Sequence, residues 1–371
     1  MSPIRRVAII GAGLAGLACA VAVTRAGLAV DVYASDSIGS AEDLHLDAVP
    51  NLVRSLDRLG ILVQCQGLGF AYSRTRTTDA SGRILESLPL PRLAGDGKPA
   101  GLGLLQNDLL RALSSRAIQQ GAQVYPCTPA IAIESGAGVV HLADASKVDA
   151  DLVLLAAGLD APLRRSVFVH APQTTCHEQQ WWHLVLPRAP GMDHPTMMVG
   201  RRGQKLHVVP IAPTKAGLTF CTSSFQPLEE QTHAQILSAA LRNFSGWPAA
   251  WQEVLRDNPP LVISPVREAL LPQPWHCDRV LAVGDSAHAV VPHFGQGPAQ
   301  ALEDAVVLQE LLMQRLSVAE LMTSFTARRL GRVKKVHELT GRAALWDEHP
   351  VPSTDMRALS QALAEVLSKP A

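Results

Sequence analysis

The feature that most constrains the fold of this 371-residue chain is a glycine pattern close to its amino terminus. A short expected strand, residues 5–10, ends in four apolar residues and leads into the sequence Gly11-Ala-Gly13-Leu-Ala-Gly16, and a run of small residues follows. In such a strand–turn–helix unit the first glycine permits the tight turn, the second lets a pyrophosphate approach, and the third lets helix and strand pack closely. A β-branched stretch at residues 30–33 completes a β-α-β unit, which predicts a dinucleotide-binding parallel sheet.

This unit predicts one site for the phosphates of the ligand and another for its adenosine ribose. The free backbone amides at the helix start, around Leu14 and Ala15, and the helix dipole favour a bound phosphate. A carboxylate at the end of the second strand normally binds the adenosine ribose. Here that position is Ala34, with Asp36 two residues later. Either Asp36 replaces the missing carboxylate from the loop, or it is a solvated loop residue and water or backbone groups hold the ribose.

A second glycine-rich segment lies near residue 290 and reads GDSAHAVVPHFGQGPA from residue 284. An apolar stretch, residues 280–283, delivers a carboxylate at its end, where it can accept a hydrogen bond from a ribityl or ribose hydroxyl. The glycine loop then opens a helix near a proline, a residue favoured in the first helical turn, so a second positive helix terminus is expected beside the ligand. The residues expected to contact the ligand in this segment are Gly284, Asp285, Gly295, Gln296, Gly297, Pro298 and Ala299.

This segment resembles the GD-x-x-H-x-x-x-P-x-x-G-Q-G motif of the FAD-dependent aromatic hydroxylases, the para-hydroxybenzoate and salicylate hydroxylase family of group A flavoprotein monooxygenases. The resemblance extends over most of residues 4–340. It implies an α/β fold, in which a Rossmann-like FAD-binding domain with a parallel sheet is interleaved with an antiparallel-sheet substrate domain and followed by C-terminal helices. The expected FAD-binding domain comprises 1–70, 101–165 and 276–345, the substrate domain 71–100 and 166–275, and the helical tail 346–371.

The resemblance also implies a reaction. NAD(P)H, as co-substrate, reduces the FAD cofactor, O2 adds to give a flavin C4a-hydroperoxide, and a small aromatic or heteroaromatic ring takes the distal oxygen. The protein must exclude water, position the ring and, in many members, deprotonate a phenol.

Three positions depart from the family pattern. Ala157, before Gly158, stands where the family usually has an aspartate that supports the pyrophosphate region and nicotinamide use. Gln106 stands where many members have an arginine on the flavin phosphates, and Pro298 cannot donate a backbone N–H to the flavin pyrimidine. Two alternatives therefore stay open: an FAD oxidoreductase of the same fold that does not take hydride directly from NAD(P)H, and a flavin-binding protein without turnover.

Three histidines are candidates for the site. His45 precedes the helix expected at 50–59, close to where some pyridine-hydroxylating members of the family carry a histidine near the substrate. The resemblance implies a base at His45, and the alternative is an ordinary loop histidine. His293 follows Pro292 and precedes the glycine loop, so both residues are expected in front of the flavin, with His293 lining the substrate pocket. His288 is expected to pack under the Gly-Asp turn as a structural residue.

Other segments have simpler interpretations. The adjacent Trp181 and Trp182 on a strand must point to opposite faces, so at most one reaches the pocket. Glu303 and Asp304 are expected to cap or pair near their helix. Residues 89–103 read as a crossing loop and residues 228–244 as a helix. A basic cluster reads as a solvated helix face and consists of Arg328, Arg329, Arg332, Lys334 and Lys335.

Composition excludes several classes of partner. Lys+Arg and Asp+Glu are both 33, and only 4% of residues are aromatic, which argues against nucleic-acid or acidic-membrane binding. The six cysteines are scattered without a C-x-x-C pair, as expected of buried thiols in a reducing compartment rather than of a metal site. Residues 7–24 are uncharged, but their regular glycines argue against a secretory signal. A cytoplasmic monomer or homodimer is therefore expected.

Overall fold

The computed structural model describes residues 4–39, 44–200, 204–223, 232–351 and 353–371. A six-stranded sheet has the order β18-β19-β12-β1-β2-β8. Every pair is parallel except β18–β19, so the expected parallel sheet is present. Its strands are β1 (Arg6–Ile10), β2 (Ala29–Tyr33), β8 (Gln123–Tyr125), β12 (Leu152–Leu155), β18 (His276–Cys277) and β19 (Val280–Ala282).

A second sheet has seven strands in the order β17-β13-β16-β15-β14-β5-β6. Its neighbours are antiparallel except β14 and β5, which pair in parallel although β5 lies far from β14 in the sequence. The edge strand β17 was not predicted from the sequence, because its polar residues and Pro265 interrupt the apolar alternation. The strands are β5 (Arg74–Asp79), β6 (Ile84–Pro89), β13 (Thr175–Pro187), β14 (Thr196–Val199), β15 (Lys205–Pro210), β16 (Lys215–Ser223) and β17 (Val262–Leu270).

Two small sheets complete the strands. One has the order β11-β10-β9, with β9 (Ala130–Glu134), β10 (Val139–Leu142) and β11 (Lys147–Asp149). The other sheet is β3 (His45–Ala48), β7 (Gly101–Leu105) and β4 (Phe70–Tyr72), in the order β3-β7-β4. The prediction of a loop over 89–103 is therefore wrong at its end, because Gly101 and Gly103 lie in a strand that packs tightly against Tyr72 and Pro210.

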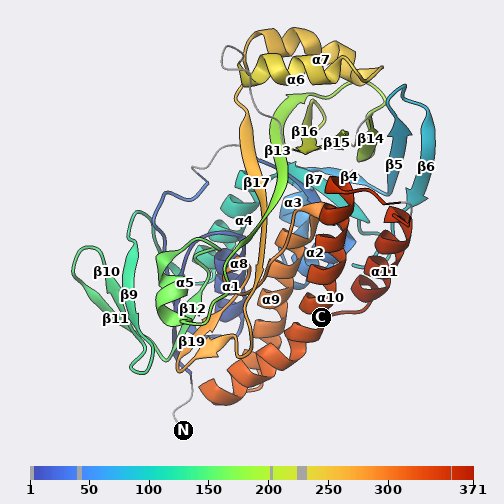
Figure 1. Cartoon of the computed structure of the whole chain (residues 1–371). Helices are drawn as coiled ribbons and strands as arrows, with labels where there is room; N and C mark the ends of the chain where they lie inside the picture. The colour runs from blue at the N-terminus through green and yellow to red at the C-terminus, as the bar shows by residue number, and fades with distance from the viewer. Residues whose placement is uncertain (1–3, 40–43, 201–203, 224–231, 352) are drawn as a thin grey trace.

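Helices cover both large sheets. Within the described residues they are α1 (Leu14–Arg25), α2 (Pro50–Arg58), α3 (Leu62–Leu68), α4 (Gln106–Gln119), α5 (Pro162–Val167), α6 (His233–Leu241), α7 (Trp247–Arg256), α8 (Asp285–His288), the 3-10 turn η2 (His293–Gly295), α9 (Gln296–Leu312), α10 (Val318–Glu348) and α11 (Met356–Ser368). Of the helix expected over 228–244, residues 228–231 lie outside the described residues, and α6 ends at Leu241, three residues earlier than expected. Figure 1 shows α6 and α7 across the far end of the seven-stranded sheet, and α11 on the outer side of α10.

Each large sheet has its own core. The buried strands of the central sheet pack against α1, α4 and α9 in one continuous apolar cluster. A second cluster joins Trp182 and Phe220 of the seven-stranded sheet to apolar side chains of α6 and α7. The fold class predicted from the sequence is confirmed, whereas the exact domain boundaries stay a prediction. The space where the two sheets meet is where the functional residues gather.

The cysteines agree only in part with their interpretation. All six are free thiols, and Cys19, Cys65 and Cys221 are buried. Cys127 and Cys176 are exposed, which the scattered pattern alone did not reveal. Within the described part of the chain no helix is both long and apolar enough to cross a bilayer.

Candidate active site

The first glycine loop packs tightly against backbone atoms on one side and is open on the other. Gly11 has φ +109°, and a Cβ there would lie 2.3 Å from the carbonyl oxygen of Ala156, at the end of β12. A Cβ on Gly16 would lie 1.9 Å from the oxygen of Gly11. A Cβ on Gly13 would meet no described atom within 4 Å. Gly11 and Gly16 are therefore required by the fold, and Gly13 leaves room for a ligand to approach the backbone.

The second glycine loop meets the first. Gly284 has φ +56°, and a Cβ on it would lie 2.5 Å from the Cβ of Ala15. Helix α9 begins after Gly295, which is left-handed at φ 64°, and it packs along α1. A Cβ on Gly297 would meet no described atom within 4 Å. The convergence of the two loops, which the sequence predicted, is confirmed.

Both helix starts lack a side-chain cap. The N-cap residues, Gly13 of α1 and Gly295 of α9, make no capping hydrogen bond. The first amides of a helix have no partner within the helix, so an uncapped start offers donors and a positive dipole end to an anionic or electron-rich group. Pro298 lies in the first turn of α9, as expected, where its missing N–H removes no helical hydrogen bond.

A third glycine supports the same edge of the sheet. Gly158 follows β12 with φ +85°, and the space beside it is free of described atoms within 4 Å. Its amide donates to the hydroxyl of Ser286 at 3.1 Å, and Arg164 Nε donates to the Ser286 carbonyl at 2.8 Å. These bonds join the end of β12 to the Gly-Asp turn. Asp285 begins α8 as a solvent-exposed residue, yet the surrounding protein raises the pKa of its carboxyl by desolvation.

Three predicted cofactor residues lie at the margins of this edge. Ala34 follows β2 as a buried residue, and its amide donates to the carbonyl of Tyr125. Asp36 is exposed and accepts a hydrogen bond from Ser35 at 2.7 Å. Gln106 is the first residue of α4, and its amide donates to the carbonyl of Leu44. The structure thus leaves the ribose-binding role of Asp36 a prediction.

Beneath the second loop lies a buried group of charges. Asp304 accepts hydrogen bonds from the Gly284 amide at 2.8 Å, from His288 Nε2 at 2.7 Å and from Arg329 Nε at 2.7 Å. Burial alone would raise the pKa of Asp304, but His288, Arg329 and the hydrogen bonds outweigh it and hold that pKa at about 2. His288 is therefore structural, as predicted, and Asp304 ties the Gly-Asp turn to α9 and α10.

The prediction that the basic cluster is a solvated helix face is wrong for Arg329 and Arg332. The Arg329 side chain is fully buried, and Arg332 is 9% exposed. Both donate to Glu303, Arg329 at 3.0 Å and Arg332 at 2.6 Å. Their partners lie on α9, about thirty residues earlier, and a sequence pattern on α10 alone cannot reveal them. Arg328, Lys334 and Lys335 are on the exposed face, as expected.

The same network reaches the glycine loop and the carboxyl terminus. Asn51 Nδ2 donates to Glu303 at 3.1 Å and to the Gln296 side chain at 3.2 Å. Arg54 donates to the carbonyls of Leu367 at 3.1 Å and Lys369 at 2.9 Å. The first residue of α9 and the end of α11 are therefore held by one hydrogen-bonded system.

Above the second loop lies a group of rings, which we call the ring cluster: His45, Trp181, His183 and His293. Trp181 and His293 have ring centroids 5.2 Å apart, and His45 and His183 have theirs 5.7 Å apart. Trp181 belongs to this cluster and Trp182 to the second core, so the two indoles serve opposite faces of β13, as predicted.

His45 lies in β3, which corrects its alternative interpretation as a loop histidine. Its Nε2 is 2.9 Å from the hydroxyl of Thr219, and its ring packs against Gly217, where any Cβ would collide with it. Burial, together with His183 and His207, lowers the pKa of His45 well below its usual value. His45 is therefore neutral near pH 7.

His293 is buried, with 6% of its side chain exposed, in the short turn that follows Pro292. Its Nε2 is 3.3 Å from Asp347 Oδ2, at the end of α10, and the other oxygen of Asp347 is bound by Lys205. Its Nδ1 has no hydrogen-bond partner among the described residues. Burial lowers the pKa of His293 more than Asp347 raises it, so this ring is neutral too.

Sequence reasoning missed several of these residues. Asp347 and Lys205 stand in no recognisable motif, and Asn51 reads as an ordinary helix residue. Thr219 and His183 lie on β16 and β13, and nothing in the sequence shows that they face His45. The one usable signal was the presence of polar residues at strand positions where the alternating pattern would place apolar ones.

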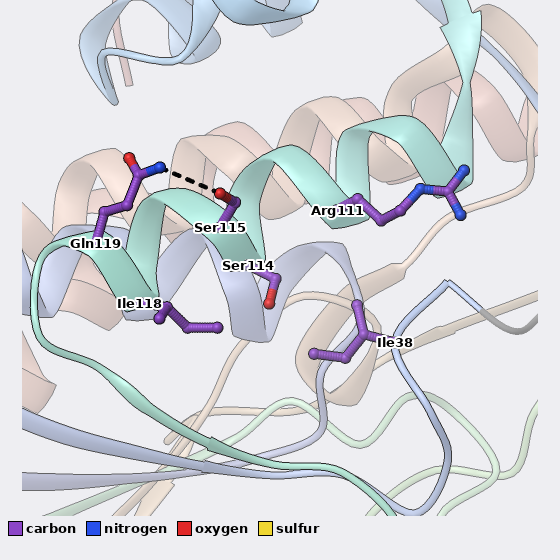
Figure 2. A pocket seen from close by; sticks show the side chains of 6 residues that line it. All are labelled: Ile38, Arg111, Ser114, Ser115, Ile118 and Gln119. Atoms are coloured by element: carbon purple, nitrogen blue, oxygen red, sulfur yellow. Dashed lines mark hydrogen bonds between the residues drawn. The ribbon is translucent and has the colours of Figure 1, made fainter.

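A hollow of about 350 Å³ lies elsewhere, on the outer side of α4 (Figure 2). Its lining consists of Ile38, Arg111, Ser114, Ser115, Ile118 and Gln119. Apart from Ile38 these side chains come from one helix, and the lining contains no glycine loop and no ring of the cluster. We therefore assign it neither the cofactor nor the substrate.

The fold and the paired glycine loops define a dinucleotide-binding α/β protein of the flavoprotein class, with a second sheet over the expected ring site. Residues 5–340 match the protein family described as "FAD binding domain", and the chain belongs to that family. Open backbone at Gly13, Gly158 and Gly297, beside two uncapped helix starts, fits FAD as the bound dinucleotide.

Several proteins are similar over nearly their whole length. The 2-heptyl-3-hydroxy-4(1H)-quinolone synthase of Pseudomonas aeruginosa is 30% identical, over 92% of this chain and 90% of its own. The putative FAD-dependent monooxygenase YetM of Bacillus subtilis is 26% identical, over 90% of this chain and 91% of its own. The crystal structure of Klebsiella pneumoniae HpxO complexed with FAD and uric acid has a TM-score of 0.84 at 22% identity, covering 99% and 97% of the two chains. At the level of the family, the predicted FAD-dependent monooxygenase class is confirmed.

Proposed function

We propose that this protein hydroxylates a small aromatic or heteroaromatic compound, using FAD, O2 and NAD(P)H. The observation that carries the proposal is the contact between the two glycine loops at Gly284 and Ala15, directly beside a cluster of neutral rings. One helix start suits the pyrophosphate, and the other suits the electron-rich end of the isoalloxazine. When bound, FAD supplies the redox chemistry, accepting hydride and activating O2.

Residues of both glycine loops hold the cofactor in this proposal. The amides after Gly13 bind the pyrophosphate, and Asp285 accepts a hydrogen bond from a ribityl hydroxyl. The charges beneath the loops do not reach the ligand. They fix the Gly-Asp turn and Gln296, so this turn and the start of α9 are already in place before the cofactor binds.

The ring cluster positions the substrate. Pro292 and His293 stand directly before the glycine loop, and Trp181 lies edge-on to His293. His45 and His293 are neutral near pH 7 because burial lowers the pKa of each, so either ring can accept a hydrogen bond from the substrate. The four rings also exclude water from the face of the second sheet.

The relatives support a heteroaromatic substrate. The named product of the Pseudomonas aeruginosa relative is a quinolone, and HpxO is complexed with uric acid. Both compounds are planar and carry ring N–H groups. A planar nitrogen heterocycle with a ring hydroxyl or N–H is therefore the first substrate class to screen.

A second candidate is an FAD oxidoreductase that receives electrons from a partner protein or another donor. Ala157 and Pro298 favour it, because the first removes a carboxylate expected near the nicotinamide and the second removes an N–H donor. Stopped-flow reduction of the FAD-loaded protein with NADH and NADPH separates the two. Bleaching at 450 nm with either, accelerated by a heterocycle of the screen, supports the first. Absence of bleaching with every compound, together with reduction by dithionite, supports the second.

The cytoplasmic location and the monomeric or homodimeric state stay predictions. Light scattering after gel filtration measures the second directly. A tetramer or larger assembly would contradict it.

A further inference from the structure

Asp347 lies beyond residues 5–340, the part of the chain that matches the family. It stands on the next-to-last residue of α10, and 11% of its side chain is exposed. One oxygen binds Lys205 of β15 and the other faces Nε2 of His293. A segment outside the family match therefore contributes a carboxylate to the ring cluster.

The positive charge of Lys205 balances the negative charge of Asp347. The Lys205 ammonium, 19% exposed, is the counter-ion of Asp347, so the carboxylate is satisfied without a proton from His293. The charged and titratable groups that act on His293 are Asp347, Lys205 and His177, and burial lowers its pKa most strongly. The ring therefore stays neutral while its Nε2–H donates to Asp347.

The tautomer follows from this bond. A neutral imidazole has one N–H and one acceptor nitrogen, and the carboxylate next to Nε2 can only accept. The proton must then sit on Nε2, and Nδ1 carries the lone pair. Nδ1 is buried and has no partner among the described residues.

We propose that Asp347, held by Lys205, is a positioning residue that fixes His293 as an acceptor at Nδ1, so that the site selects an aromatic ring bearing an O–H or N–H group. The ligand part of this inference rests on the proposed function. The role of Asp347 rests on the three side chains alone. It parallels the general use of a carboxylate to orient a histidine and set its tautomer.

The decisive variant is Asp347→Asn, which keeps the shape and removes the charge. The Lys205 ammonium can only donate, so the amide oxygen of the new side chain turns to it and the amide NH₂ faces His293. Nε2 must then accept, and the ring proton moves to Nδ1. The variant therefore converts the presented nitrogen from an acceptor into a donor.

The measurement is the long-range ¹H–¹⁵N spectrum of ¹⁵N-histidine-labelled, FAD-loaded protein at pH 7.5, with the His293 signals assigned by their loss in His293→Gln. The wild-type protein is expected to show the Nε2–H tautomer, and Asp347→Asn the Nδ1–H tautomer. An Nδ1–H tautomer or an imidazolium in the wild type, or an unchanged tautomer in Asp347→Asn, overturns the proposal.

Two further variants control for folding and charge. Glu348→Gln changes the neighbouring carboxylate, which accepts from the Glu178 amide at 2.6 Å and does not contact His293, so the tautomer should not change. Lys205→Met removes the counter-ion and should raise the pKa of His293 by at least one pH unit. A tautomer change in Glu348→Gln, or no rise in Lys205→Met, contradicts the proposed roles.

The ligand class is tested by titrating the flavin absorbance with quinolin-4-ol, uric acid and 4-hydroxybenzoate, each beside its O- or N-methylated counterpart. The protic compound is expected to bind at least tenfold more tightly in the wild type and less than threefold more tightly in Asp347→Asn. Equal affinities in the wild type overturn the substrate class. If no compound perturbs the flavin, the proposed aromatic substrate fails, and the tautomer spectrum still decides the role of Asp347.

Discussion

Two groups of buried polar side chains flank the second glycine loop, and they differ in how completely they are satisfied. Beneath the loop, each Asp304 oxygen and the Arg329 guanidinium have hydrogen-bond partners. Above it, His45 and His293 each keep an Nδ1 without a partner among the described residues. The lower group carries full charges and the upper group is neutral. A closed network holds a scaffold, whereas open acceptors on neutral rings are available to a ligand.

Among the substitutions that test this difference between the two groups, Arg329→Met is expected to have the largest effect. It removes the arginine that binds both Asp304 and Glu303, two buried carboxylates, and removing one partner of a buried pair costs about 3–5 kcal/mol. Urea unfolding followed by circular dichroism measures the loss. The control is Arg328→Met, since Arg328 makes a half-exposed pair with Glu310 and its loss should cost less than about 1 kcal/mol. Equal losses in both variants would show that the network is not a scaffold.

The next effect separates stability from turnover. We expect His293→Gln to reduce ligand-stimulated NAD(P)H oxidation by about 100-fold, the lower end of the usual range for a residue that moves or holds a proton. Its free energy of unfolding should stay within about 1 kcal/mol of the wild type. His288→Gln should do the reverse and mainly destabilise the protein, because it weakens the bond to Asp304. His45→Gln is the parallel test for the other ring, and unchanged turnover and pH profile in both ring variants would remove histidine from the mechanism.

The two groups should lower the stability of the folded protein in different pH ranges. The pKa of His183 is lowered from 6.5 to about 4 by burial, and burial also lowers those of His45 and His293. A depressed folded-state pKa means that stability is complete above the unfolded value of 6.5 and is lost as the pH falls toward 4. Asp304, held at about 2 against 3.8, adds its loss only below about pH 4.

We therefore expect the free energy of unfolding to fall by roughly 2 kcal/mol between pH 7 and pH 4.5. Urea midpoints at pH 4.5, 5.5, 6.5 and 7.5 measure it. His183→Gln should flatten the profile in this range. A profile of equal slope in the variant would assign the loss to other groups.

The smallest effect concerns the loop between the two groups. Gly13 has φ −75°, and a Cβ on it meets no described atom within 4 Å, so Gly13→Ala should leave the apoprotein as stable as the wild type within about 0.5 kcal/mol. FAD affinity, measured by fluorescence quenching, should fall about tenfold because the methyl group occupies the pyrophosphate approach. Gly16→Ala is the contrast, since its methyl group would collide with the Gly11 carbonyl. Unchanged FAD affinity in Gly13→Ala would place the pyrophosphate elsewhere.

Local pattern accounts for much of the fold and for part of the site. The glycine spacing at 11–16 and the segment at 284–299 predicted both loops, because a turn and a helix start depend on neighbouring residues. The edge strand β17 and the strand β7 were missed, because polar or glycine residues in them are tolerated only through contacts with β13, β3 and Pro210. The helix face of Arg329 and Arg332 was misjudged for the same reason, since Glu303 lies on another helix.

The sequence by itself determined the dinucleotide-binding unit, the second glycine loop, the division into a parallel and a largely antiparallel sheet, and the candidate status of His45 and His293. The first two depend on spacing within about thirty residues, whereas the antiparallel sheet and the candidate status of His45 were implied by the family resemblance. Only the tertiary structure decided which charges are buried, that His45 lies in a strand, and that Asp347 and Lys205 reach His293. Hydrogen bonds and burial join side chains by distance in space, and residues 205, 293 and 347 become neighbours only when the sheet and the last helices pack together.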